Sequence, residues 1–114
     1  MEAADSAHTG LTFARTDGPD GHVRIAVSGE IDLTTVGDLR RTVDATIGEA
    51  GVARLDLGVA GLTFLDSRGT TALIETRRLA RSRRVGFRVV NATGTVLRVL
   101  TALGAHRMLA GQPR

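Results

Sequence analysis

A serine between an aspartate and a glycine is the feature of this sequence best suited to regulatory chemistry. Ser67 lies where an apolar run gives way to a segment with helical spacing, with Asp66 before it and Gly69 after it. Unpaired backbone N–H groups and the positive end of the helix dipole favour an added anion at such a position. The sequence therefore offers a site for a phosphoserine switch at Ser67.

The same residues also have an ordinary structural interpretation. Serine and aspartate at the start of a helix usually cap it, and the residues alone favour this role for Ser67 over a switch. Asp66 is a second candidate cap for that helix. Asp32, Thr34 and Thr35 are candidate caps for an earlier helix.

Composition places the chain among small globular domains and excludes several classes of function. Its 114 residues are enough for one domain, and no apolar run approaches the roughly 20 residues that span a bilayer. The N-terminus lacks the basic and apolar regions of a signal peptide, and there is no cysteine, so we expect a cytoplasmic protein without membrane contact.

Motifs for catalysis, cofactors and metals are missing from the sequence. It contains no P-loop, no G-x-G-x-x-G and no G-x-S-x-G elbow, and its three histidines are widely scattered. We therefore expect a protein that is not an enzyme and that has no cofactor and no metal.

Arginines are concentrated in one segment, at positions 77, 78, 81, 83 and 84. An Arg-rich helix over Arg77–Arg84 would suit a nucleic-acid binder, which is one alternative function. We favour a solvated helix face, because these arginines largely avoid the apolar stripe and no aromatic residues are interleaved with them. Direct binding of nucleic acid is therefore not expected.

Strands are predicted where apolar and polar residues alternate, and helices where apolar residues recur every three or four positions. The alternating segments are 11–16, 22–28, 52–57 and 85–90, with a turn over 17–21, a strand break at Gly29 and a loop over 58–61. The helical segments are near 33–48, 68–83 and 94–103, the last with the stripe Val96, Val99, Leu100 and Leu103.

This order predicts an α/β fold with at least two parallel strand connections. We expect four main strands in one sheet, and a short fifth strand near 106–110. The domain should span 11–110, with a flexible N-terminus over 1–10 and a flexible tail over 111–114.

Five segments in register resemble the STAS domain family, in particular its free-standing anti-sigma factor antagonists. The match covers roughly residues 11–110. Its elements are Ser28-Gly29-Glu30-Ile31-Asp32, which is similar to G-x-[LI]-D, Leu55-Asp56-Leu57, Phe64-Leu65-Asp66-Ser67-Arg68-Gly69, which is similar to F-x-D-S-[ST]-G, the segment 85–91, and Leu100-Thr101-Ala102-Leu103-Gly104.

The resemblance implies a four- to five-stranded mixed sheet with helices mainly on one face. It also implies that the unphosphorylated domain binds an anti-sigma factor and thereby releases a sigma factor. That partner is commonly a serine kinase of the histidine-kinase-type ATPase fold, which phosphorylates the serine corresponding to Ser67, and a phosphatase reverses the modification. With this resemblance, the switch becomes the favoured interpretation of Ser67.

Two residues depart from the family pattern next to that serine. Arg68 replaces a usual Ser or Thr and places a cation beside the acceptor, and Thr70 replaces a usual Leu, which predicts a more polar interface edge. We expect the partner surface to comprise Asp32, Thr63, Asp66, Ser67, Arg68, Gly69 and Thr70. A second alternative function is an accessory STAS subunit of a larger transport or stress-signalling assembly.

Overall fold

One mixed sheet of four strands forms the centre of the molecule in the computed structural model, which describes residues 10–111. Its strands β1 (Leu11–Asp17), β2 (His22–Ile31), β3 (Arg54–Leu65) and β4 (Gly86–Val90) follow one another in space as in sequence. β1 is antiparallel to β2, whereas β2, β3 and β4 are parallel. The α/β fold with four main strands is thus confirmed.

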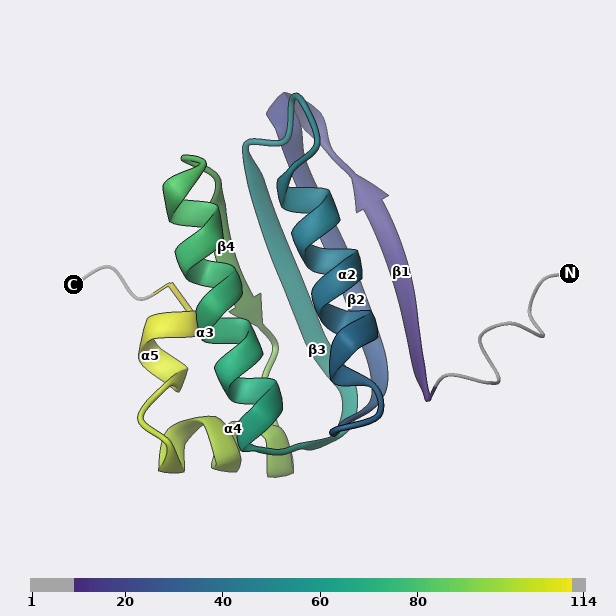
Figure 1. Ribbon diagram of the computed structural model, residues 1–114, viewed down its shortest axis with the longest axis vertical. Helices are drawn as coiled ribbons and strands as arrows, with labels where there is room; N and C mark the ends of the chain where they lie inside the picture. The colour runs from purple at the N-terminus through teal and green to yellow at the C-terminus, as the bar shows by residue number, and fades with distance from the viewer. Residues whose placement is uncertain (1–9, 112–114) are drawn as a thin grey trace, which may run out of the picture.

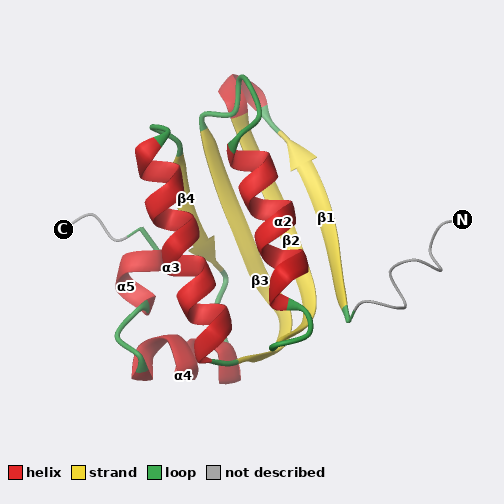
Figure 2. Cartoon of the chain, in the orientation of Figure 1, coloured by secondary structure: helices red, strands yellow, loops and turns green. Residues whose placement is uncertain are grey.

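Two long helices connect the parallel strands and lie side by side across one face of the sheet (Figure 1). They are α2 (Val36–Ile47) and α3 (Ser67–Ser82). Two shorter helices follow, α4 (Gly94–Ala102), which contacts β3, and α5 (His106–Leu109), which contacts α3 and β4. Figure 2 shows the red helices α2 and α3 in front of the yellow strands.

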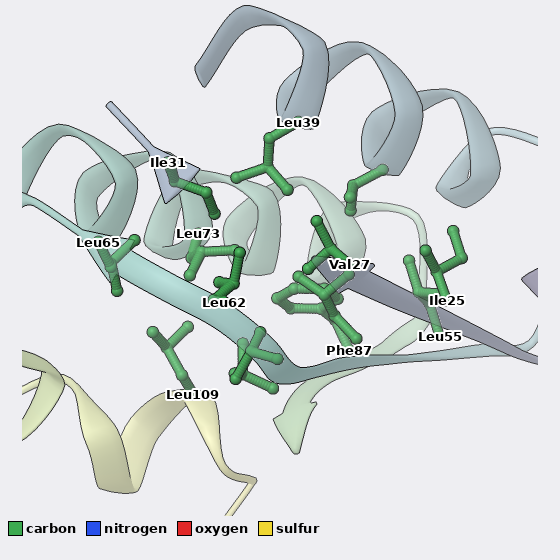
Figure 3. Close-up of a cluster of buried hydrophobic side chains, with 14 of the residues drawn as sticks. Ile25, Val27, Ile31, Leu39, Leu55, Leu62, Leu65, Leu73, Phe87 and Leu109 are labelled. Carbon is green, nitrogen blue, oxygen red and sulfur yellow. The ribbon is translucent and has the colours of Figure 1, made fainter. Parts of the chain in front are cut away.

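The core lies between the sheet and these helices. Leu39 and Val43 of α2 and Leu73 of α3 are almost fully buried, as are Leu55 and Leu57 of β3. Figure 3 shows Leu39 and Leu73 near the strand residues, while Leu109 reaches the core from α5. The predicted apolar stripes of α2 and α3 are therefore confirmed as core faces.

The prediction that Gly29 breaks the second strand was wrong. β2 continues to Ile31, and Gly29 has φ +117 at an irregularity in the pairing with β3. A Cβ there would lie 1.9 Å from the Gly10 carbonyl oxygen, so glycine allows a bend that another residue would obstruct.

The loop expected over 58–61 is also absent, because β3 continues without a break to Leu65. Gly58 pairs with Ala26 of β2, and Gly61 pairs with Ser28. A Cβ on Gly61 would lie 2.2 Å from the Ser28 hydroxyl oxygen. Glycine therefore serves close contact between strands here, not a turn.

Two expectations at the C-terminal end were wrong as well. Residues 106–109 form helix α5 rather than a fifth strand, since Ala105 and Leu109 are both buried at helical spacing. Leu103, expected in the apolar stripe of α4, is 51% exposed because it ends the helix and the chain turns at Gly104. The flexible segments were expected over 1–10 and 111–114. Of these, residues 1–9 and 112–114 lie outside the described residues.

Candidate functional site

The carboxyl ends of two neighbouring parallel strands bring the predicted site residues together. Ile31 of β2 pairs with Leu65 of β3, so Asp32 and Asp66 leave the sheet at the same end. The N-terminal ends of α2 and α3 lie at that end too (Figure 1). This arrangement is the one expected from parallel strands followed by helices.

Asp66 forms the N-cap of α3, which confirms its expected structural role. Its backbone is extended, and its carboxylate accepts a hydrogen bond from the Gly69 amide at 3.0 Å. Ser67 is the first residue inside the helix. The alternative interpretation of Ser67 as the cap is therefore wrong, because Asp66 already holds that position.

Ser67 is exposed, and within residues 10–111 its hydroxyl has no hydrogen-bond partner. It lines a hollow of about 290 Å³ together with residues of both long helices, which we call the Ser67 hollow. The lining residues are Val36, Arg40, Ser67, Arg68 and Thr71. The hydroxyl is thus free for modification or for contact with a partner.

Two of the predicted surface residues lie beneath the surface. Gly69 is buried, and a Cβ there would lie 2.4 Å from a Leu65 methyl and 2.7 Å from an Ile31 methyl, so this glycine permits close packing of α3 on the strand ends. Thr70 is 2% exposed and donates to the Asp66 carbonyl at 3.2 Å. Thr70 therefore does not make the exposed edge more polar, contrary to expectation.

Asp32 organises the turn between β2 and α2. Its carboxylate accepts hydrogen bonds from the Thr34 hydroxyl at 2.7 Å and from the Thr34 amide at 2.9 Å. These bonds, the hydroxyl one above all, lower the pKa of Asp32, so the residue carries a negative charge at neutral pH.

The candidate caps of the first long helix behave differently from that of α3. α2 begins at Val36, and Thr35 takes the N-cap position without a side-chain bond to the helix. Its hydroxyl donates instead to the Glu30 carbonyl at 2.8 Å. Asp32 and Thr34 therefore belong to the preceding turn rather than to the helix start.

A second hollow, of about 510 Å³, opens beside Asp32. Its lining residues, which define the Asp32 hollow, are Gly10, Gly29, Glu30, Asp32, Thr34, Thr35 and Thr63. Thr63 is exposed, and its hydroxyl donates to the Gly29 carbonyl at 3.3 Å. Asp32 and Thr63 thus line one polar depression, while Ser67 and Arg68 line the other hollow, so the residues of the expected partner surface are divided between two hollows.

Sequence reasoning missed two exposed apolar side chains at this end of the sheet. Leu33 is 65% exposed and directly follows Asp32, and Phe64, near the end of β3, is 41% exposed. Large exposed hydrophobic residues beside polar ones are typical of protein-binding surfaces. The exposure of Leu33 was not predicted because the residue was assigned to the following helix. That of Phe64 was not predicted because the residue lies in an apolar run.

Sequence reasoning also missed Arg40, because this residue belongs to no recognisable motif. It forms an ion pair with Glu75 of α3 while lining the Ser67 hollow. Arg68, which follows Ser67, is 60% exposed and has a guanidinium nitrogen 3.8 Å from an Asp66 carboxylate oxygen. Two cations therefore line the same hollow as the serine.

The arginine-rich segment lies in the second half of α3 and just after its end, away from Ser67. Arg78, Arg81, Arg83 and Arg84 are exposed, as the predicted solvated face requires, whereas Arg77 is only partly exposed. Within the described part of the chain, none of them forms an ion pair with an acidic residue.

A metal site and a membrane-spanning helix are both absent from residues 10–111. No group of three or more histidine, cysteine, aspartate or glutamate side chains could hold a metal ion there. No helix in this range is long and apolar enough to cross a membrane.

Comparison with known proteins gives the same fold. The STAS domain model matches residues 14–113. No curated protein matches the chain. Among solved structures, an anti-sigma factor antagonist from Mycobacterium paratuberculosis is 26% identical, with a TM-score of 0.70 over 82% of this chain and 78% of that one.

Two further structures share the fold at lower identity. The anti-sigma factor antagonist SpoIIAA in its unphosphorylated form is 22% identical, with a TM-score of 0.70 over 82% of each chain. The murine anion transporter Slc26a9 is 19% identical, with a TM-score of 0.67 over 76% of this chain but only 14% of its own.

Proposed function

This chain belongs to the STAS domain family, and from that premise we propose that it is an anti-sigma factor antagonist controlled at Ser67. In the unphosphorylated state it binds an anti-sigma factor and thereby releases a sigma factor. Phosphorylation of Ser67 ends this binding. The domain acts as a binding partner, not as a catalyst, and works in the cytoplasm.

The observation that carries the proposal is the free and exposed hydroxyl of Ser67. Asp66 caps α3, so the helix does not need the serine for its stability. Ser67 is nonetheless placed at the end of the sheet where Leu33, Phe64 and Asp32 also reach the surface. The likeness to antagonists, one of them solved in a form described as unphosphorylated, supports the same role.

The partner that fits this role is a serine kinase of the histidine-kinase-type ATPase fold, opposed by a phosphoserine phosphatase. A kinase must reach the Ser67 hydroxyl, and exposure of that residue at the start of α3 permits such access. The apolar pair Leu33 and Phe64 would supply desolvated contact area, while Asp32 would supply charge at the rim.

Phosphorylation would act mainly across the interface. It adds about −1.5 to −2 charges at pH 7, which the helix N-terminus tolerates within the free domain. Against an acidic group on the partner, one unit charge at about 6 Å and an effective dielectric near 20 costs roughly 3 kcal/mol. The modification should therefore weaken binding by a factor of roughly a thousand or more.

The test begins with capture of the kinase by the intact protein and its identification by sequencing. The captured kinase is then incubated with this protein and ATP, the modified residue is located by mass spectrometry, and both forms are titrated against the kinase. Phosphate at Ser67 and a large loss of affinity are expected. Stoichiometric phosphate elsewhere, or equal affinity of the two forms, would contradict the proposal.

Three variants sharpen this test. Ser67→Ala should bind constitutively and take up no phosphate, and Ser67→Asp should weaken binding only in part, since it adds a single charge. Thr101→Val is the matched control, because Thr101 of α4 is also exposed on its helix and lines neither hollow. It should leave the extent of phosphorylation unchanged.

A second candidate function follows from the likeness to Slc26a9, in which a domain of this fold is a small part of an anion transporter. An accessory subunit of a transport or signalling assembly would use the same exposed surface without modification of Ser67. Constant affinity for its partner in the presence of ATP and the kinase would favour this function.

A further inference from the structure

Arg40 and Glu75 form a cross-helix ion pair that the role of an antagonist does not itself require, and Arg40 also lines the Ser67 hollow. Arg40 belongs to α2 and Glu75 to α3, and both side chains are partly exposed. An exposed pair of this kind contributes little to stability. The position of Arg40 in the same hollow as the proposed modification site suggests a different use.

The two helices are held in a fixed register around this pair. The Thr76 hydroxyl of α3 donates to the Asp44 carboxylate of α2 at 3.1 Å, one turn beyond Arg40 on α2. On α3, Ser67, Thr71 and Glu75 recur every four residues and so share one face of the helix. Arg40 lies opposite this face, lining the Ser67 hollow while its guanidinium group binds Glu75.

The Arg40 guanidinium group can bind an anion at either end of this face, which means either the Glu75 carboxylate or a phosphate on Ser67. An arginine side chain is long and flexible, and it binds carboxylate and phosphate groups with the same forked set of donors. A phosphate on Ser67 would add about twice the charge of the Glu75 carboxylate inside a hollow that Arg40 already lines.

We propose that Arg40 is the intramolecular ligand of the Ser67 phosphate, and that Glu75 holds this arginine only while Ser67 is unmodified. The inference rests on the proposed phosphorylation of Ser67. Phosphorylation then has two effects. It places an anion at the partner surface, and it moves the Arg40 guanidinium group from Glu75 to the phosphate on Ser67. Arg68 adds a second cation to the phosphate, with Asp66 as its present neighbour.

The experiment needs neither the kinase nor the anti-sigma factor. Phosphoserine is introduced at position 67 during translation, and the second pKa of the phosphate, about 6 in a free group, is followed by ³¹P NMR. Arg40→Gln should raise this pKa by about half a unit, the shift expected for the loss of a unit charge about 6 Å away in water. Glu75→Gln should lower it, because it removes both a negative charge and the competitor for Arg40.

Arg41→Gln is the matched control. Arg41 follows Arg40 on the same helix, is 74% exposed and binds Asp38, and it does not line the Ser67 hollow. This variant removes the same charge and should shift the phosphate pKa much less. Thermal unfolding of the three unmodified variants should match the parent, which separates phosphate binding from a structural role.

Equal pKa shifts for Arg40→Gln and Arg41→Gln would overturn the inference, as would a higher phosphate pKa in Glu75→Gln. Either result would leave the proposed function intact, because neither kinase nor partner takes part. Conversely, a kinase that does not phosphorylate Ser67 would refute the proposed function. The phosphate pKa values measured by NMR would not be affected by that result.

Discussion

The Asp66 carboxylate accepts a hydrogen bond from the Gly69 amide at 3.0 Å, and this contact separates the cap of α3 from the residue at its first position. Asp66 thus stabilises the start of the helix, whereas Ser67 presents an exposed hydroxyl group. The two roles that one short motif suggested belong to two adjacent residues, and substitutions can test them separately.

Asp66→Ala should lower the free energy of unfolding by about 1 kcal/mol, the usual cost of losing an N-cap. Ser67→Ala should change it by less than about 0.5 kcal/mol, because an exposed hydroxyl without a partner contributes little. Urea unfolding followed by circular dichroism measures both. Asp66→Asn is the control, since asparagine also caps helices. A larger loss for Ser67→Ala than for Asp66→Ala would contradict the assignment.

Local periodicity and topology were enough to predict most of the fold and the location of Asp32 and Ser67 at the same end of the sheet. The alternation in β2 and the stripe of α3 reflect which side faces the core, so they can be read from the residues directly. Gly29, Gly58 and Gly61 misled the prediction, because glycine permits a close approach of strands as well as a turn, and only the neighbouring strand distinguishes the two.

The candidate site was predictable only where a motif marked it. Ser67 and Asp66 lie in a recognisable segment, whereas Arg40 comes to line the Ser67 hollow through the packing of α2 against α3 alone. Thr70 shows the converse. It lies within the motif, yet it is buried because the turn of the helix directs it inward. A linear pattern cannot show which side of a helix start faces a partner.

Leu33 and Phe64 should be anchors of the partner surface. Leu33→Ser and Phe64→Ser should each weaken binding of the captured anti-sigma factor at least tenfold, because truncating an apolar anchor at a protein interface costs about 1.4 kcal/mol or more. Isothermal titration calorimetry gives the affinities. Leu103→Ser is the matched control, since Leu103 is equally apolar and 51% exposed but lines neither hollow. Equal losses in all three variants would place the surface elsewhere.

The Arg-rich part of α3 should be dispensable for folding and should not bind DNA. Arg78→Gln combined with Arg81→Gln should change the free energy of unfolding by less than about 0.5 kcal/mol for each residue, because both side chains are exposed. Neither the parent protein nor the variant should bind duplex DNA with sub-micromolar affinity at physiological salt in a fluorescence anisotropy titration. Tight binding that weakens with salt and disappears in the variant would support the nucleic-acid alternative.

Asp56 of β3 is the buried carboxylate that should dominate the acid sensitivity of the fold. Its two oxygens accept hydrogen bonds from Arg88 Nε and Nη2, each at 3.0 Å, and a His22 ring nitrogen lies 3.0 Å away. Only 5% of the side chain is exposed. The Arg88 bonds, followed by that of His22, outweigh burial and lower the pKa of Asp56 to about 2.

Because this pKa is lower in the folded than in the unfolded chain, the carboxylate stabilises the fold above about pH 4, and the contribution is lost as the pH falls towards 2. Its size is about 2 kcal/mol. Asp56→Asn should therefore be less stable than the parent by about that amount at pH 7 and nearly equal to it near pH 2, as measured by urea unfolding at each pH. Asp17→Asn, which removes an exposed partner of Arg15, should have little effect at any pH. A stability difference between Asp56→Asn and the parent that stays constant from pH 7 to pH 2 would show that Asp56 acts through packing rather than through its charge.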